Sequence, residues 1–341
     1  MNAKPLKAEA WALYDELVAR AATPDYTNPW VNIAGGGMAY QPDFGTLRKL
    51  LGVPLLLGAT SQSGVPALAL DVWVAYELRR AGFEPDLVWP RAHAPRILPS
   101  TMVAMLAGAT NKQRPALQDM LKSGKTYSGE TGASANILGK NYVKQVDVVM
   151  SAWNTGPEIM ISTKRMDSSF GKNAANRVEE SYGDAKNLRS RHPQAALGFV
   201  YGLRSTAFRD ASATAAWIID LLGKLGREDD AYDAVALLIP DWPDVGPADD
   251  EDDGDSDNPL VAAGIEPEDE TLNDQLPLDL PSSALNERLA ALQEVALRLD
   301  LVPDHLSPDT FFATMTDRVL DNCPITFHTE ARRRRGQPTL P

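Results

Sequence analysis

The sequence predicts a mixed α/β protein in which helices cover a central sheet. Of its 341 residues, 44% are hydrophobic, enough for one large core or two smaller ones. In the middle of the chain, short apolar runs of strand length alternate with longer segments of helical periodicity. Their order is helix, strand, strand, helix, strand, helix, strand, which favours a layered α/β arrangement.

Composition divides the chain into four regions. Residues 1–125 are expected to be mostly helical, and 126–240 to form the core with the sheet. An acidic, proline-rich stretch at 241–282 predicts a disordered insert or linker. The remaining residues, 283–341, predict a C-terminal helical region with a basic tail.

The N-terminal region predicts mainly helices. One is expected over residues 8–22, where Trp and Leu side chains recur near one face. A second is expected over 66–81, with a proline near its start and a glycine just after its end. Asp71, Glu77 and Arg80 of this helix are expected at the core edge or on the surface. The other expected elements are a loop at 32–40, a strand at 53–57, an extended segment at 86–99 and short helices at 100–109 and 114–122.

The central and C-terminal regions supply the other elements. In the helix over residues 174–191, Pro193 marks the end, because a residue that precedes proline disfavours the helical conformation. The arginine run at 332–335 predicts a mobile basic tail. The other expected elements are strands at 143–150, 158–162, 195–203 and 232–239, and helices at 211–225, 283–299 and 308–320.

Charge is distributed very unevenly along the chain. The net charge is −13, yet residues 241–280 hold 15 acids and no Lys or Arg. Without that window, 33 basic residues face 31 acidic ones, so the global charge says little about the rest of the protein. Residues 161–209 contain nine Lys and Arg against four acids, which makes them the most basic long stretch in the body of the chain.

Several classes of protein are disfavoured. The chain lacks a run of about 18 apolar residues, and its N-terminus lacks the apolar segment of a secretory signal. A single cysteine, Cys323, allows no intrachain disulfide and fits the reducing cytoplasm. With one cysteine and scattered histidines, a structural zinc site is not expected.

The chemistry is concentrated around two predicted neighbouring strands. Asp147 is the one acid in the apolar run 146–150, and burying an unpartnered carboxylate there is costly. Lys164 ends the next expected strand, with Ser162 two residues before it. An acid and a lysine on adjacent strands suit hydrolysis of a phosphodiester with a divalent metal. Taken singly, each residue also fits a solvent-facing strand position.

This arrangement resembles the PD-(D/E)XK, restriction-endonuclease-like superfamily, in which an Asp on one strand precedes (D/E)-X-K on the next. The chain departs from that pattern, because Ser162-Thr163-Lys164 replaces the usual acid by serine. It is similar to the variant of restriction enzymes that cut sites with a CCGG core. These use S-X-K and take the missing carboxylate from an R-X-E on the following helix, which Arg177-Val178-Glu179 matches.

The resemblance implies a restriction-endonuclease-like sheet and a type II, Mg²⁺-dependent DNA endonuclease. Asp147 and Glu179 would bind the metal, with Glu180 open as an alternative to Glu179, while Lys164 would act on the phosphate and Ser162 would support the site. It also implies double-stranded DNA as partner, a 5′-phosphate product and a homodimer or higher oligomer. Phosphate contacts are expected from four residues around the helix: Lys172, Arg177, Lys186 and Arg189.

Three alternatives stay open. The missing acid of the motif also fits a non-catalytic DNA-binding or defence-complex subunit on a degenerate nuclease fold. Glu158 is a further carboxylate on the strand of Ser162, and Glu130 is a further acid upstream. The loop at 58–64 suggests nucleotide binding, although it lacks the Gly-Lys-Ser/Thr of a phosphate loop.

Overall fold

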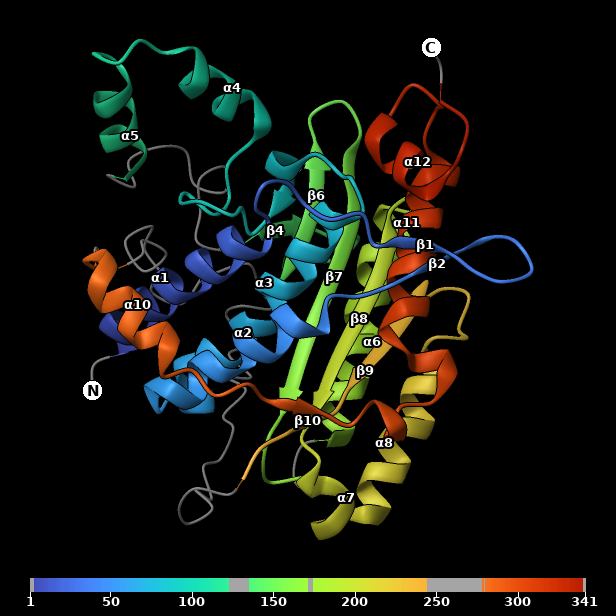
Figure 1. Ribbon diagram of the computed structural model, residues 1–341. Coiled ribbons are helices and arrows are strands. Elements are labelled where there is room, and N and C mark those ends of the chain that lie inside the picture. Colours follow the sequence, from blue (N-terminus) through green and yellow to red (C-terminus); the bar gives the residue numbers. More distant parts are fainter. Residues whose placement is uncertain (1–2, 123–134, 171–173, 244–277, 279, 340–341) are drawn as a thin grey trace.

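A five-stranded mixed sheet forms the centre of the protein (Figure 1). The computed structural model describes residues 3–122, 135–170, 174–243, 278 and 280–339. The strand order is β3-β6-β7-β8-β9, with β3–β6 and β6–β7 antiparallel and the pairs β7–β8 and β8–β9 parallel. The strands are β3 (Val88–Trp89), β6 (Val148–Ala152), β7 (Gly156–Met166), β8 (Ala196–Leu203) and β9 (Ala234–Leu238).

Helices cover both faces of this sheet. The parallel strands are joined by crossovers that carry α6 (Ala174–Arg191) between β7 and β8, and α7 (Thr206–Asp210) with α8 (Ser212–Leu225) between β8 and β9. The opposite face is covered by α1 (Ala3–Ala21), α2 (Phe44–Leu57), α3 (Val65–Arg80) and α11 (Pro308–Asn322). The predicted mixed α/β architecture with flanking helices is therefore confirmed.

Short two-stranded ribbons and smaller helices complete the described chain. The ribbons pair β1 (Trp30–Asn32) with β2 (Met38–Tyr40), β4 (Ala135–Leu138) with β5 (Val143–Val146), and β10 (Pro240–Asp241) with β11 (Ala296–Leu297). The helices are α4 (Ser100–Gly108), α5 (Arg114–Lys122), α10 (Ser282–Ala290) and α12 (Thr329–Arg335). Within the described ranges, no helix combines the length and the apolar character needed to cross a bilayer.

The sheet separates two hydrophobic cores. Side chains alternate between the faces of a strand, so Ile159 and Ile161 of β7 join the core under α1, α2, α3 and α11. Met160 and Met166 join the other core, under α6 and α8. Every residue of β8 is buried, as expected of a central strand covered on both faces.

The expected strand at residues 53–57 is wrong, because these residues form the last turns of α2. The helix begins at an Asp43 cap, whose carboxylate accepts a hydrogen bond from the Thr46 amide. It ends at Gly58, whose left-handed conformation (φ 57°) lets its amide donate to carbonyls of the last turn. A short apolar run does not by itself distinguish a strand from the end of a buried helix.

Two further boundaries differ from expectation near the candidate chemistry. The strand predicted over 143–150 is divided by a bend at Asp147 into β5, which pairs with β4, and β6, which joins the central sheet. The strand predicted over 158–162 is longer: β7 continues to Met166, which pairs with Leu203 of β8. Lys164 therefore lies within a strand rather than at its end.

The C-terminal region also differs. The helix expected over 283–299 stops at Ala290, and the chain then runs along α2, where the Val295 amide donates to the Arg48 carbonyl. Gly52 of α2 permits this approach, since a Cβ atom there would lie 2.2 Å from the Gln293 carbonyl oxygen. The basic run predicted to be a mobile tail forms α12 instead, with Arg332 and Arg334 buried.

The acids of α3 are buried rather than placed at the surface. Glu77 is 0% exposed and forms an ion pair with Arg80 at 2.7 Å. Its carboxylate also accepts hydrogen bonds from the Tyr40 hydroxyl and the Asp43 amide. Burial is the main cause that raises the pKa of Glu77 to about 7, against the opposing effect of Arg80. The predicted acidic insert lies almost entirely outside the described residues.

Candidate active site

The candidate site is built around Asp147, at the bend that precedes β6. Its Oδ2 atom accepts a hydrogen bond of 2.7 Å from the backbone amide of Thr163 in the neighbouring strand β7. Burial raises the pKa of Asp147, and the Thr163 amide and the charge of Lys164 oppose that rise. The bend thus directs the Asp147 carboxylate, just before the start of β6, toward the segment of β7 that carries Lys164.

A second carboxylate, Asp71 of α3, reaches the same residue of β7 from the helix. The Thr163 hydroxyl donates to Asp71 Oδ1 at 2.5 Å. Thr163 therefore binds both acids, Asp147 through its amide and Asp71 through its hydroxyl. The two bonded oxygens are therefore at most about 9 Å apart. Asp71 is only 8% exposed, and its pKa is raised well above the usual value by burial first and by Asp147 second.

The two acids make the site suited to a cation. Two buried carboxyls at this separation disfavour simultaneous ionisation, so without a cation the pair retains a proton to a higher pH. A divalent cation removes that penalty by neutralising both charges, and hard oxygen donors are the ligands that Mg²⁺ prefers. Asp71 and Asp147 thus offer the oxygen donors that Mg²⁺ takes.

Lys164 lies next to Asp147, and its side chain is on the other face of β7 from that of Thr163 because successive side chains alternate. The residue is half-buried and pairs in the sheet with Tyr201 of β8. Its charge lowers the pKa of Asp147, so the lysine acts electrostatically on that carboxylate. The structure thus brings together Asp147 and Lys164, which the sequence placed on neighbouring strands.

Ser162 is 9% exposed and lies under the site on the side of α6 and β9. Its hydroxyl interacts with the phenol of Tyr232, whose own hydroxyl donates to the Ser181 carbonyl of α6 at 3.0 Å. Burial is the main cause that raises the pKa of Tyr232, and Ser162 opposes it. The serine therefore ties β7 to its neighbours, as a supporting residue would.

The acids of helix α6 differ in burial and in their contacts near the site. Lys144 forms ion pairs with Glu180 at 3.3 Å and with Asp184 at 2.6 Å, since these two acids lie one turn apart on one face. Asp184 is buried, also accepts from the Tyr142 hydroxyl at 3.0 Å, and raises the pKa of Asp147. Glu179 is exposed and is rotated about 100° from Glu180 around the helix.

The four residues expected to contact DNA are placed differently from one another. Lys172 lies outside the described residues, and Arg177 belongs to the first turns of α6. Lys186 is exposed and pairs with Asp230 at 2.8 Å. Arg189 is a packing residue: its guanidinium binds Asp233 at 2.5 Å and the Ala195 carbonyl at 2.8 Å, which joins α6 to β8 and β9.

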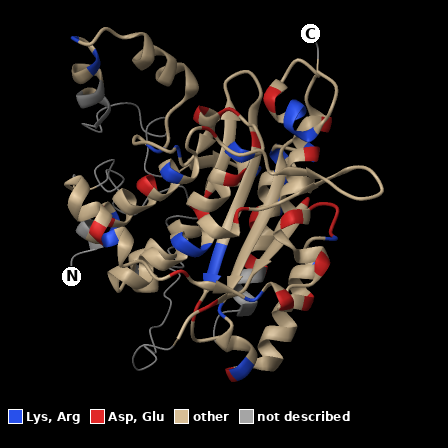
Figure 2. Cartoon of the chain, viewed as in Figure 1, with Lys and Arg blue, Asp and Glu red and all other residues tan. Residues whose placement is uncertain are grey.

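Basic side chains gather where β7 and β8 end. Figure 2 shows this end of β7 in blue, where Arg165 follows Lys164. The guanidinium of Arg204, just after β8, lies 4.2 Å from the ring centroid of Trp242, and that of Arg165 lies 5.1 Å from it. Arg165 also pairs with Asp167 at 2.8 Å and its side chain is only 5% exposed, so it is a packing residue at this end of the sheet.

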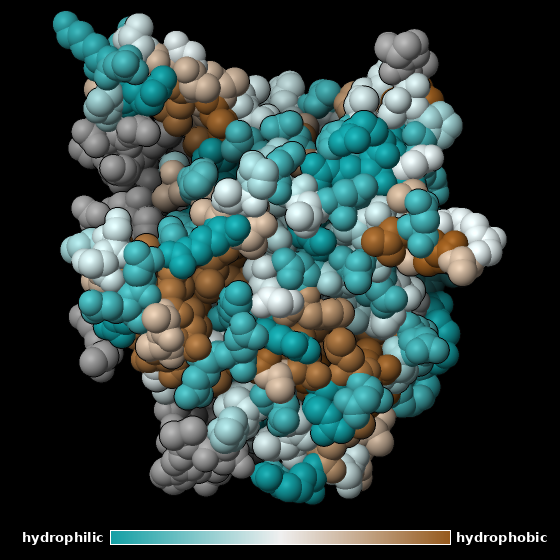
Figure 3. Space-filling view, in the orientation of Figure 1, coloured by the Kyte–Doolittle hydropathy of each residue, from teal (hydrophilic) through white to brown (hydrophobic). Residues whose placement is uncertain are grey.

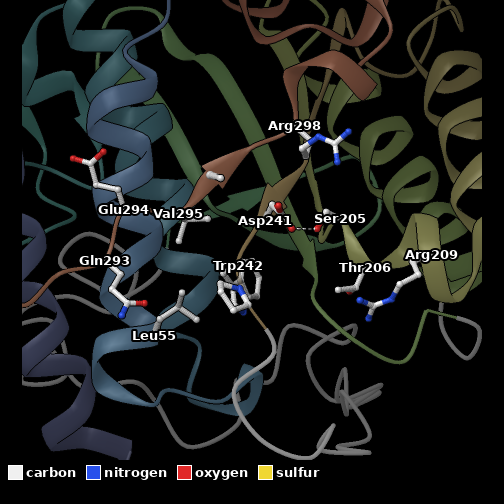
Figure 4. A pocket seen from close by; sticks show the side chains of 12 residues that line it. Leu55, Ser205, Thr206, Arg209, Asp241, Trp242, Gln293, Glu294, Val295 and Arg298 are labelled. Carbon is white, nitrogen blue, oxygen red and sulfur yellow. Dashed lines mark hydrogen bonds between the residues drawn. The ribbon is translucent and has the colours of Figure 1, made fainter.

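A cavity of about 540 Å³ opens beside these residues (Figure 4). Trp242 and Arg209 line it, and Ser205 donates a hydrogen bond to Asp241 within it. The space-filling view shows apolar side chains on the lower half of this face and a hydrophilic surface around α12 (Figure 3). The cavity is mixed in character, with a tryptophan, arginines and acids around it.

Sequence reasoning missed Asp71, Thr163 and Asp184. Asp71 carried a usable signal, since it is the only charged residue between positions 65 and 76 of an otherwise apolar helix. Such an acid is costly to bury unless it has a partner. Of the two further acids considered, Glu130 lies outside the described residues, and Glu158 lies at the other end of β7, six residues or about 20 Å from Lys164.

Comparisons with known proteins identify no relative. No family model matches the chain, and neither the curated proteins nor the solved structures include a significant match.

Proposed function

We propose that this protein is a Mg²⁺-dependent endonuclease that hydrolyses phosphodiester bonds of double-stranded DNA, of the type II restriction or phage-defence kind. The observation that carries the proposal is Thr163, whose amide binds Asp147 next to Lys164 and whose hydroxyl binds Asp71 on the α3 face of the sheet. The strand arrangement supports it. An antiparallel β3–β6–β7 unit, a crossover through α6 and a parallel β8 suit a restriction-endonuclease-like sheet.

The residues have complementary parts in such a reaction. Asp147 and Asp71 would hold the metal, which when bound supplies charge for the phosphate and lowers the pKa of a water ligand. Lys164 would hold a phosphate oxygen and orient the attacking water. Ser162 would support the lysine from beneath. Water oxygen adds to phosphorus and the bond to the 3′ oxygen breaks, which leaves a 5′-phosphate and a 3′-hydroxyl.

Three acids of α6 are candidates for the further carboxylate of this site. The resemblance to S-X-K enzymes assigns it to Glu179 or Glu180. Asp184 is a third possibility, because it is buried on the face that meets Lys144 and it acts on the pKa of Asp147. Binding of DNA is supported by the half-buried Lys164 and Arg204 at this edge of the sheet. A homodimer would allow both strands to be cut at a palindromic site.

The test is digestion of plasmid DNA with Mg²⁺, with Mn²⁺ and with EDTA. Asp147→Asn and Lys164→Ala are expected to abolish cleavage while the chain stays folded. Asp220→Asn and Lys224→Ala are matched controls, because they make the same changes in an exposed ion pair of α8. Sequencing of the ends checks the predicted 5′-phosphate, and light scattering checks the dimer.

A non-catalytic DNA-binding subunit is the second candidate. It is favoured by Ser162, which stands where the family pattern has a carboxylate. A chain that binds DNA in a salt-dependent manner but leaves it intact with Mg²⁺ and with Mn²⁺ would support this candidate and refute the nuclease.

A further inference from the structure

A second group of metal-binding side chains lies at the opposite end of β7. Glu158 is near the start of this strand, Cys323 directly follows α11, and His328 directly precedes α12. The Cys323 thiol donates to Glu158 Oε1 at 3.2 Å, and His328 Nε2 lies 2.9 Å from the same oxygen. The ligand atoms of all three residues lie within 4.8 Å of one another.

The carboxylate of Glu158 is incompletely satisfied. Its Oε1 atom has two partners, whereas its buried Oε2 atom has no hydrogen-bond partner among the described residues. The nearby Thr155 hydroxyl, which also interacts with the Glu158 carboxylate, donates to the Gly156 carbonyl at 3.2 Å. Glu158 is 7% exposed, so an unpartnered oxygen here is costly. A bound cation would satisfy it.

The turn that carries Cys323 and His328 is held in place from behind. Arg332 of α12 donates to the carbonyls of Leu320 at 2.6 Å, Cys323 at 2.8 Å and Phe327 at 3.0 Å. His328 has a left-handed backbone (φ 53°), which is uncommon for a residue other than glycine. These contacts fix the positions of the thiol and the imidazole without using either as a partner.

We propose that Glu158, Cys323 and His328 bind one Zn²⁺ ion, with water in the fourth position. A thiolate, an imidazole and a carboxylate together favour zinc over Mg²⁺ or Ca²⁺, which prefer oxygen donors alone. Ligands at about 2.0–2.3 Å from a tetrahedral zinc are about 3.3–3.8 Å apart, so the present separations require shifts of about 1 Å or less. The cysteine proton passes to solvent as the sulfur–zinc bond forms.

Access from solvent and distance from the proposed nuclease site both support the assignment of zinc. Cys323 is half-buried, which leaves a route from solvent, while the side chains of Glu158 and His328 are 7% and 5% exposed. The site lies about 20 Å along β7 from Lys164, so it does not depend on the proposed nuclease activity. It links the central sheet to α11 and α12, and zinc would stabilise that junction.

The experiment uses the full chain, freed of metal by chelation and titrated with Co²⁺. A thiolate–cobalt charge-transfer band in the near ultraviolet, saturating at one equivalent and displaced by Zn²⁺, is expected. Cys323 is the only cysteine, so this band reports on that residue alone. Cys323→Ser should remove the band, and Glu158→Gln and His328→Asn should each weaken Zn²⁺ binding at least 10-fold.

The control is His192→Asn, because His192 directly follows α6 and its ring bonds the Leu138 carbonyl at 2.9 Å, away from the three proposed ligands. It should leave binding unchanged. The proposal is overturned if the folded wild-type chain gives no thiolate band with Co²⁺, or if His328→Asn and Glu158→Gln bind zinc as tightly as wild type. The wild-type measurement decides the matter even where a variant fails to fold, and neither result depends on DNA cleavage.

Discussion

The two ends of β7 carry different chemistry although they belong to one strand. At the C-terminal end of β7, Thr163 binds Asp147 and Asp71, which offer only oxygen donors, and Lys164 lies next to Asp147. At the other end, Glu158 meets a thiol and an imidazole. The strand is common to both, so the difference comes from the elements that pack against it: α3 and the bend before β6 in one case, α11 and α12 in the other.

Carboxyl pKa values show the same contrast. Burial raises the pKa values of Asp71 and Asp147, and repulsion by Asp147 adds to the rise at Asp71. At Glu158, burial also acts to raise the pKa, but hydrogen bonds from His328 and Cys323 outweigh it, and the pKa is lowered. At the first site, Lys164 only partly offsets the effect of burial on Asp147, whereas at the second the partners of Glu158 Oε1 outweigh burial. The first site therefore suits a hard divalent cation, and the second suits a softer metal.

The largest expected effect is on cleavage. Asp71→Asn removes one of the two proposed ligands but keeps an oxygen that accepts from the Thr163 hydroxyl, so we expect a loss of about 10²–10³-fold with the fold intact. Single-turnover cleavage of a plasmid measures it. Asp220→Asn is the control, and cleavage by Asp71→Asn at the wild-type rate would show that Asp147 acts without Asp71.

Asp71→Asn should also stabilise the chain relative to wild type, by an amount that grows as pH rises. The folded pKa of Asp71 is raised above its ordinary value of 3.8, so the folded chain binds more protons than the unfolded chain above that pH. Wild-type stability therefore falls relative to Asp71→Asn as pH rises from about 4 toward the folded pKa, by at most about 1.4 kcal/mol per pH unit. The raised pKa of Glu77 is common to wild type and Asp71→Asn, so its contribution cancels from the difference in stability.

Urea unfolding of the two chains at several pH values, with EDTA present, measures this difference. A constant gap between wild type and Asp71→Asn from pH 4 to pH 8 would contradict the raised pKa. Addition of Mg²⁺ should reduce the gap, because the cation offsets the repulsion only in wild type.

At the other end of the strand, Glu158→Gln should destabilise the metal-free chain. The amide NH₂ group that replaces one oxygen has no acceptor among the described atoms around Oε2, and an unsatisfied buried donor costs about 1–3 kcal/mol. Urea unfolding with EDTA measures it. Glu180→Gln, an exposed acid on α6, is the matched control and should change stability by less than about 0.5 kcal/mol.

The smallest effects should distinguish the acids of α6. Asp184→Asn is expected to reduce cleavage more than Glu179→Gln or Glu180→Gln, because Asp184 is buried and influences Asp147. Parallel cleavage assays of the three variants rank them. A large loss in Glu179→Gln alone would instead favour the acid that the resemblance to S-X-K enzymes assigned.

Local patterns predicted much of the sheet. Helix α6 was expected over the residues where it is found, and β8 and β9 differ by one or two residues at their ends. The proximity of Asp147 to the Thr163–Lys164 segment also followed, because adjacent antiparallel strands separated by a short turn pair with each other. These features depend on periodicity and on contacts over short stretches of chain.

The partners of these residues required the folded chain. Thr163 meets Asp71 across 92 residues and Glu158 meets His328 across 170, and no periodicity extends over such distances. Arg332 and Arg334 belong to a run that resembles a solvated tail, yet both are buried because backbone carbonyls accept from their guanidinium groups.

By itself, the sequence determined the α/β class, the order of strands and helices along the core and the placement of an acid and a lysine in neighbouring segments, since hydrophobic periodicity and short-range pairing specify these features. Only the tertiary structure decided which side chains surround them. Packing of α3 against β7 brings Asp71 to the candidate nuclease site, and packing of α11 and α12 brings Cys323 and His328 to Glu158. Such contacts depend on how whole elements bury their apolar faces, which no local stretch of sequence specifies.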